Sequence, residues 1–94
     1  MSISKTLKAM SDPIRRDILS LLKRKGELSA GEIAQNFNIT NAAISYHLNL
    51  LKKADLVFET KYKNYIYYQI NITVFQELTL WLKQFEGENN ENTK

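Results

Sequence analysis

The fold is decided by one stretch of the chain, Thr40-Asn41-Ala42-Ala43-Ile44-Ser45-Tyr46-His47-Leu48-Asn49-Leu50-Leu51-Lys52-Lys53-Ala54. Its apolar residues recur at helical spacing, and Thr40 is a residue type that caps helix N-termini. The stretch therefore predicts a helix that runs through Ala54. A turn at 36–39 separates it from a shorter predicted helix, which Ser29 and Glu32 open with a capping-box pattern. Two short helices joined by a tight turn predict a helix-turn-helix.

The predicted helix 41–54 has one apolar face and one polar face. With Ile44 at the centre of the apolar face, Leu48 and Leu51 lie beside it at about 100° per residue. The outward face then holds Ala42, Tyr46, Asn49 and Lys53, with Asn41 and Ser45 on one flank and His47 on the other. Short polar residues followed by lysines suit the DNA major groove, where amides and hydroxyls contact bases and lysines contact phosphates. An ordinary surface helix has similar faces, so this helix alone leaves both interpretations open.

The rest of the chain predicts the elements around this unit. Asp12 and Pro13 form the N-terminus of a helix that ends at Gly26, and a short amphipathic helix precedes it. The β-branched and aromatic runs 56–61 and 65–70 predict a hairpin, in whose second strand Ile66, Tyr68 and Ile70 share a face. A last helix begins near Thr73. The expected fold class is mainly α with a β-hairpin wing, a winged helix-turn-helix in the order α-α-α-α-β-β-α.

Composition narrows the classes of function. Residues 1–85 carry twelve bases and seven acids, a net charge of +5, which suits a polyanionic partner. The chain has no cysteine and one histidine, so we expect no metal site and no cofactor. It shows no long apolar run and no signal-peptide pattern, which predicts a cytoplasmic protein without membrane insertion. We expect a single domain over 1–86 and a disordered polar tail over 87–94.

Four motifs, in this order and spacing, resemble the ArsR family of bacterial transcriptional repressors. They are the opening stretch 9–19 (AMSDPIRRDIL), the short run 32–34 (EIA), the helix-turn-helix end 44–57 (ISYHLNLLKKADLV) and the wing strand 66–70 (IYYQI). Each motif alone is weak, but the ordered set spans residues 7–70. Within the family, the chain is most similar to the metal-independent SdpR-type autorepressors. The resemblance implies a repressor that binds double-stranded DNA and is not an enzyme.

The chain departs from the family pattern in three places. The stretch 27–32 has no cysteine where the metal sensors of the family carry them, and the last helix has no histidine. Metal sensing is therefore not carried over. At the wing turn, Lys63-Asn64 stands where the family usually has glycine followed by arginine. This leaves Lys61 and Lys63 as the wing's predicted phosphate contacts instead of a minor-groove arginine.

The predicted DNA contacts are of two kinds. The base-reading set is Asn41, Ala42, Ser45, Tyr46 and Asn49. The phosphate set is Thr40, Lys52, Lys53, Lys61 and Lys63, with Arg15 and His47 as further candidates. For His47 a structural hydrogen bond is favoured over a DNA contact, and Arg15 could instead pair with an acid such as Asp12. The wing tyrosines 65, 67 and 68 could stack on unpaired bases, although cross-strand packing is the commoner role in a hairpin.

Apolar residues of the first and last helices predict a homodimer, because a monomer of 94 residues cannot readily cover them. This dimerisation set is Ile3, Leu7, Met10, Phe75, Leu78, Trp81, Leu82 and Phe85. The aromatic residues among them could instead line a cofactor pocket, but burial in the core or the dimer is favoured.

The leading hypothesis is therefore an autoregulatory repressor whose homodimer binds a palindromic operator. The alternative is a protein-interaction module without specific DNA binding. Relief of repression could come from a small molecule, from a protein antirepressor or from autoregulation alone.

Overall fold

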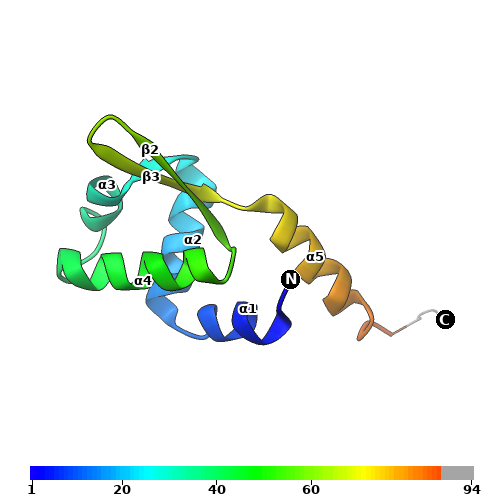
Figure 1. Cartoon of the computed structure of the whole chain (residues 1–94). Helices are drawn as coiled ribbons and strands as arrows, with labels where there is room; N and C mark the ends of the chain where they lie inside the picture. Colours follow the sequence, from blue (N-terminus) through cyan, green and yellow to red (C-terminus); the bar gives the residue numbers. More distant parts are fainter. Residues whose placement is uncertain (88–94) are drawn as a thin grey trace.

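The computed structural model describes residues 1–87, in which a small antiparallel sheet lies at one edge of a group of helices (Figure 1). The helices are α1 (Ile3–Ala9), α2 (Pro13–Lys25), α3 (Ala30–Ala34), α4 (Asn41–Lys53) and α5 (Ile72–Lys83), and the strands are β1 (Leu28–Ser29), β2 (Val57–Tyr62) and β3 (Tyr65–Ile70). The predicted order and the winged helix-turn-helix class are confirmed, with β1 as an addition. The tail predicted over 87–94 lies, apart from its first residue, outside the described residues.

Local capping groups set the ends of α2. The carboxylate of Asp12 accepts a hydrogen bond from the backbone N–H of Arg15 at 3.1 Å, and Pro13 occupies the first helical position. Proline suits this position because its missing N–H would have no partner within the helix. The helix ends at Gly26, whose φ of 87° is a conformation that side-chain-bearing residues rarely adopt.

The helix-turn-helix is capped in the same way. Ser29 and Glu32 form both bonds of a capping box: Oγ of Ser29 accepts from the N–H of Glu32 at 3.1 Å, and Oε1 of Glu32 accepts from the N–H of Ser29 at 2.8 Å. At the start of α4, Oγ1 of Thr40 accepts from the N–H of Ala43 at 3.0 Å. These side chains satisfy N–H groups that have no partner inside the helices, so α3 and α4 begin where the sequence predicts.

Strand β1 was not predicted from the sequence. It is two residues long, and it pairs with β3 through Leu28 opposite Tyr68 and Ser29 opposite Tyr67. Two residues are too few to show a strand pattern, and the pairing depends on a partner far along the chain. The sheet order β1-β3-β2 attaches the hairpin to the segment that leads directly into α3. The wing is therefore fixed relative to the helix-turn-helix.

The hairpin itself follows the prediction. Strands β2 and β3 pair from Val57 opposite Ile70 to Tyr62 opposite Tyr65, which leaves Lys63 and Asn64 as the turn. Lys63 has a φ of 57°, in the left-handed region. The turn thus carries a lysine at the far end of the wing.

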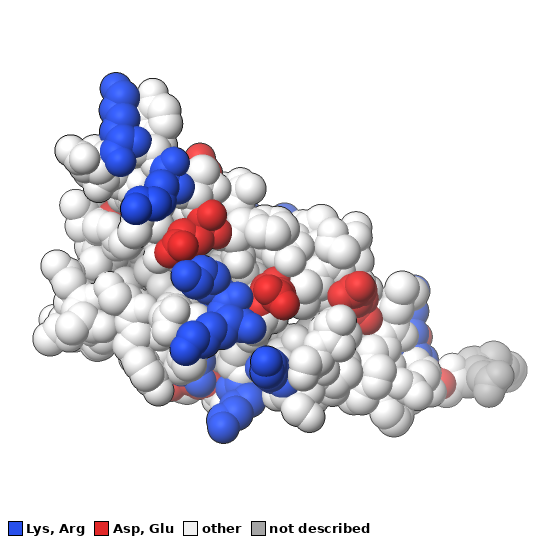
Figure 2. All heavy atoms as spheres, in the orientation of Figure 1, with Lys and Arg blue, Asp and Glu red and all other residues white. Residues whose placement is uncertain are grey.

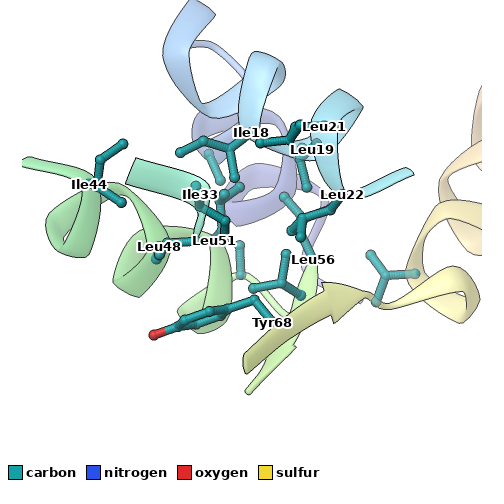
Figure 3. Close-up of a cluster of buried hydrophobic side chains, with 14 residues drawn as sticks. Ile18, Leu19, Leu21, Leu22, Ile33, Ile44, Leu48, Leu51, Leu56 and Tyr68 are labelled. Atoms are coloured by element: carbon teal, nitrogen blue, oxygen red, sulfur yellow. The ribbon is translucent and has the colours of Figure 1, made fainter. Parts of the chain in front are cut away.

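The core lies between α2, the helix-turn-helix and the sheet, where side chains from all of them point toward one another (Figure 3). Its fully buried apolar residues are Ile18, Leu22, Ile33, Ile44, Leu48, Leu51 and Leu56. Three of them come from α4, whose buried face is the one predicted from the sequence. Because α4 is held on this face along its length, its opposite face is presented to solvent.

A tight junction connects α4, the wing and α5. Asp55 follows α4 with a φ of 60°, and the N–H of Leu56 donates back to the carbonyl of Leu51 at 3.0 Å. The side-chain amide of Asn71, the residue before α5, donates to the carbonyl of Asp55 at 2.9 Å. From this junction α5 extends away from α2 and α4, beside the N-terminal end of α1 (Figure 1).

Candidate nucleic-acid interface

The outward face of α4 is exposed to solvent. All five predicted base-reading residues are exposed: Asn41, Ala42, Ser45, Tyr46 and Asn49. Within residues 1–87, their side chains form no hydrogen bond with the protein. Tyr46 is the most prominent of them, with 59% of its surface exposed and its ring edge-on to His47. This face offers amide and hydroxyl groups whose hydrogen-bonding capacity is unused.

Lysines flank this polar face. Lys53 is exposed at the end of α4, and Lys61 and Lys63 are exposed on the wing. Thr40 is exposed at the other end of the helix, where its hydroxyl serves as the cap. Figure 2 shows basic side chains of the wing, the end of α4 and α1 on one face of the molecule, with a few acidic side chains between and beside them. A band of positive charge beside a polar helix matches the electrostatic footprint of a nucleic-acid-binding protein.

Lys52 is already paired within the protein. Its ammonium group lies 3.2 Å from Oε1 of Glu59, and the hydroxyl of Tyr68 donates to the other oxygen of this carboxylate, also at 3.2 Å. Burial, together with the negative charge of Glu59, raises the pKa of Tyr68 to about 12, so the phenol stays protonated. These contacts connect α4 to both strands of the wing. Lys52 therefore has a structural partner that the sequence did not indicate.

The structure places Arg15 in a buried joint between helices, which argues against the phosphate contact considered for it. Its Nε donates to the carbonyl of Ala9 at 2.6 Å, and one terminal nitrogen lies 3.1 Å from Nδ1 of His47. The guanidinium is therefore directed into the protein and only 9% of the residue is exposed. Sequence alone could not show this, because the carbonyl that Arg15 reaches lies at the end of another helix.

His47 serves the same joint. Because a guanidinium can only donate, Nδ1 of the imidazole accepts, and in the neutral ring the proton is on Nε2. Asp12 completes the group, with its carboxylate 4.0 Å from Nδ1. The joint links the start of α2, the end of α1 and the middle of α4, so it fixes the orientation of the exposed face of α4. The structural role favoured for His47 agrees with this geometry.

Asp12 gives the joint a pH dependence that can be measured. The hydrogen bond from the backbone N–H of Arg15 is the main cause that lowers the pKa of Asp12. A carboxyl whose pKa is lower in the folded state contributes stability above its unfolded pKa, about 3.9, and loses it as the pH falls through the folded value. Asp12→Asn keeps a capping oxygen but removes the charge.

We expect wild type to be more stable than Asp12→Asn near neutral pH, and this difference to shrink as the pH falls below the unfolded pKa of about 3.9 and through the lower folded value. Urea unfolding followed by circular dichroism at a series of pH values measures it. Asp17→Asn, an exposed substitution on the same helix, is the control. A difference between wild type and Asp12→Asn that stays constant over the pH range would contradict this origin of the shift.

Two lysines on α1 were missed by sequence reasoning. Lys5 and Lys8 are exposed, and with Tyr46 and Lys53 they line a groove between α1 and α4 of about 490 Å³. Their helical spacing of three residues places them on one side of α1. No local pattern brings α1 beside α4 in the sequence, so only the folded structure adds these lysines to the basic band.

The predicted dimerisation residues differ in how far they are exposed. Leu7, Leu82 and Phe85 are exposed, whereas Ile3, Met10, Phe75 and Trp81 are half-buried. Leu78 is the exception, because it is buried within the protomer and is not available to a partner. Two exposed apolar residues of α5, Ile72 and Leu80, were absent from the prediction.

Within residues 1–87, histidine, aspartate and glutamate side chains form no group of three or more that could hold a metal ion. None of the helices in this part of the chain has the length and apolar character needed to cross a bilayer.

Known proteins are similar to this chain in sequence and in fold. The family of helix-turn-helix domains matches residues 10–58. The transcriptional repressor SdpR of Bacillus subtilis is 44% identical over 89 residues, which cover 93% of this chain and 98% of SdpR. This similarity extends through the wing and α5, beyond the helix-turn-helix alone.

Solved structures of transcriptional regulators have a similar fold. An ArsR-like transcriptional regulator from Rhodococcus sp. RHA1 superposes with a TM-score of 0.78 at 28% identity, covering 86% of this chain and 76% of that one. The homodimeric winged helix-turn-helix DNA-binding domain from Mycobacterium bovis superposes with a TM-score of 0.73 at 25% identity, covering 98% and 84%. Family and fold are those of DNA-binding regulators, not of enzymes. The chain belongs to the ArsR family of winged helix-turn-helix transcriptional repressors.

Proposed function

We propose that this repressor acts as a homodimer whose two α4 helices read a palindromic operator in its own promoter. The observation that carries the proposal is the exposed face of α4, where polar side chains without internal partners lie between lysines of the wing and of α1. In a two-fold dimer such helices enter successive major grooves about 34 Å apart. The base-reading set is the one predicted: Asn41, Ala42, Ser45, Tyr46 and Asn49.

The phosphate set is proposed with changes from the sequence prediction. Thr40, Lys53, Lys61 and Lys63 are retained, and Lys5 and Lys8 are added because they line the same groove as Lys53. Lys52 is retained as a secondary contact, since its ammonium group is shared with Glu59. Arg15 and His47 are assigned to the joint that orients α4.

The homodimer is supported by the exposed apolar residues Leu7, Leu82 and Phe85 and by the homodimeric relative from Mycobacterium bovis. Similarity to the transcriptional repressor SdpR supports repression, and we propose that this repression is autoregulatory and takes place in the cytoplasm. The absence of cysteine from the sequence, together with the engagement of its one histidine by Arg15, supports a repressor that does not respond to metals. A protein antirepressor is one candidate for the signal that relieves repression.

The test compares two duplexes, a palindrome from the protein's own promoter and a random sequence of equal length. Fluorescence anisotropy should give a much higher affinity for the palindrome, and the affinity for both should fall as salt is raised from about 50 to 200 mM. Equal, weak binding to every duplex would instead favour the protein-interaction module.

The lysines make a separate prediction. Lys61→Ala, Lys63→Ala or the pair Lys5→Ala and Lys8→Ala should weaken binding to both duplexes alike. Because each substitution occurs in both protomers, one lost phosphate contact per protomer should flatten the log–log salt slope by about two units. Lys25→Ala, an exposed lysine at the end of α2, is the control and should leave the slope unchanged. An unaltered slope in the wing and α1 variants would remove those residues from the interface.

A further inference from the structure

A groove lies between α2, the end of β3 and the start of α5, and the proposed DNA contacts do not include it. It encloses about 560 Å³, within the usual range for small-molecule sites. Its apolar walls come from Met10, Leu19, Ile70, Ile72 and Phe75. The end of α1, α2, β3 and α5 supply these side chains, so the groove exists only in the folded protomer.

Cations of α2 flank this apolar surface. Arg16, Lys23 and Arg24 line the groove, and no aspartate or glutamate within residues 1–87 does so. The cations recur at intervals of seven and eight residues along α2, which places them on one side of the helix. Arg16 is held in place because one of its terminal nitrogens donates to the carbonyl of Met10 at 2.8 Å. Its remaining N–H groups are available to an anion.

We propose that this groove binds an amphipathic anion, a carboxylate on an aliphatic chain. The apolar walls would cover the chain, and the guanidinium and ammonium groups would hold the carboxylate. DNA is a poor occupant, because a phosphate backbone would leave the apolar walls without a partner. Ile72 and Phe75 belong to α5, so a bound ligand would contact the helix that we propose as part of the dimer interface. Any effect of the ligand on operator affinity rests on the proposed function. Binding of the ligand to the groove does not rest on it.

Isothermal titration calorimetry of the full chain with octanoate, without DNA, tests binding directly. Octanoate should bind, acetate should not, and 1-octanol should bind about tenfold more weakly because it lacks the charge. The double variant Lys23→Glu and Arg24→Glu should lower octanoate affinity about tenfold or more while leaving 1-octanol unaffected. Lys25→Glu, in the same helical turn but outside the groove, is the matched control and should bind octanoate as wild type does.

The apolar walls are tested through Ile72, which is 53% exposed and therefore tolerates substitution without loss of the fold. Ile72→Ser should weaken octanoate and 1-octanol alike. Absence of octanoate binding, or equal binding by wild type and the Lys23→Glu, Arg24→Glu variant, would overturn the proposal. Octanoate binding that occurs only in monomeric protein would also overturn it. The second copy of the chain would then be the occupant of the groove in the dimer. Loss of operator affinity in the double variant without any ligand would assign Lys23 and Arg24 to DNA and would also overturn the proposal.

Discussion

The double substitution Leu82→Glu and Phe85→Glu is expected to convert the proposed homodimer into a folded monomer. Both side chains are exposed in the protomer, at 49% and 69%, so their removal costs the isolated fold little. Phe85 also packs edge-on against Trp81, with ring centroids 5.2 Å apart, which makes the two rings one apolar surface. Four carboxylates in a two-fold interface would have no partners and would repel one another.

The effect on DNA binding should be large. A dimer engages two half-sites, and the second contact is intramolecular once the first has formed. Loss of that linkage is expected to lower operator affinity by about 10² to 10⁴-fold. Sedimentation equilibrium gives the oligomeric state, circular dichroism checks the fold, and anisotropy gives the affinity.

Leu80→Glu is the matched control for this double variant. Leu80 is 70% exposed on the same helix but lies about 160° around it from Leu82. It should therefore leave the dimer and the operator affinity unchanged. A wild-type protein that sediments as a folded monomer, or a dimer that survives Leu82→Glu and Phe85→Glu, would refute the interface. If Leu80→Glu alone dissociates the dimer, the opposite side of α5 forms the contact.

Features that depend on neighbouring residues could be predicted from the sequence. Asp12, Ser29 and Thr40 cap the helices that follow them, because each cap bonds an N–H three residues ahead. The buried face of α4 follows from the spacing of its apolar residues. These confirmed features were sufficient for the fold class and for the side of α4 that faces solvent.

Features that depend on distant residues could not be predicted in this way. Arg15 has the sequence appearance of a surface cation, and only the position of α1 and of His47 makes it a buried donor. Leu78 belongs to the apolar stripe of α5, but a stripe does not distinguish residues covered by the protomer from those left for a partner. For the same reason the lysines of α1 entered the candidate interface only when the structure placed them beside α4.

Substitutions on the exposed face of α4 should reduce discrimination between operator and random duplex more than they reduce overall affinity. Ser45 and Tyr46 lie where base edges are proposed to be, and their side chains have no hydrogen-bond partner within residues 1–87. A good base contact discriminates by about 1–3 kcal/mol, and each operator holds two copies of it. Ser45→Ala and Tyr46→Ala together should therefore lower the ratio of the two affinities by about a hundredfold or more. Binding to random duplex should change little.

Two further variants separate base reading from other roles of this face. Tyr46→Phe keeps the ring that lies edge-on to His47 and removes only the hydroxyl, so it should reduce discrimination if that hydroxyl contacts a base. If Tyr46 only covers apolar surface, Tyr46→Phe will bind as wild type does.

Lys53→Ala, on the same helix, should weaken binding to both duplexes and leave the ratio of the two affinities unchanged, because contacts to phosphates do not depend on the base sequence. Isotherms on both duplexes at several salt concentrations distinguish these outcomes. If Ser45→Ala and Tyr46→Ala leave the ratio unchanged while the dimer stays folded, α4 does not read the bases of the operator.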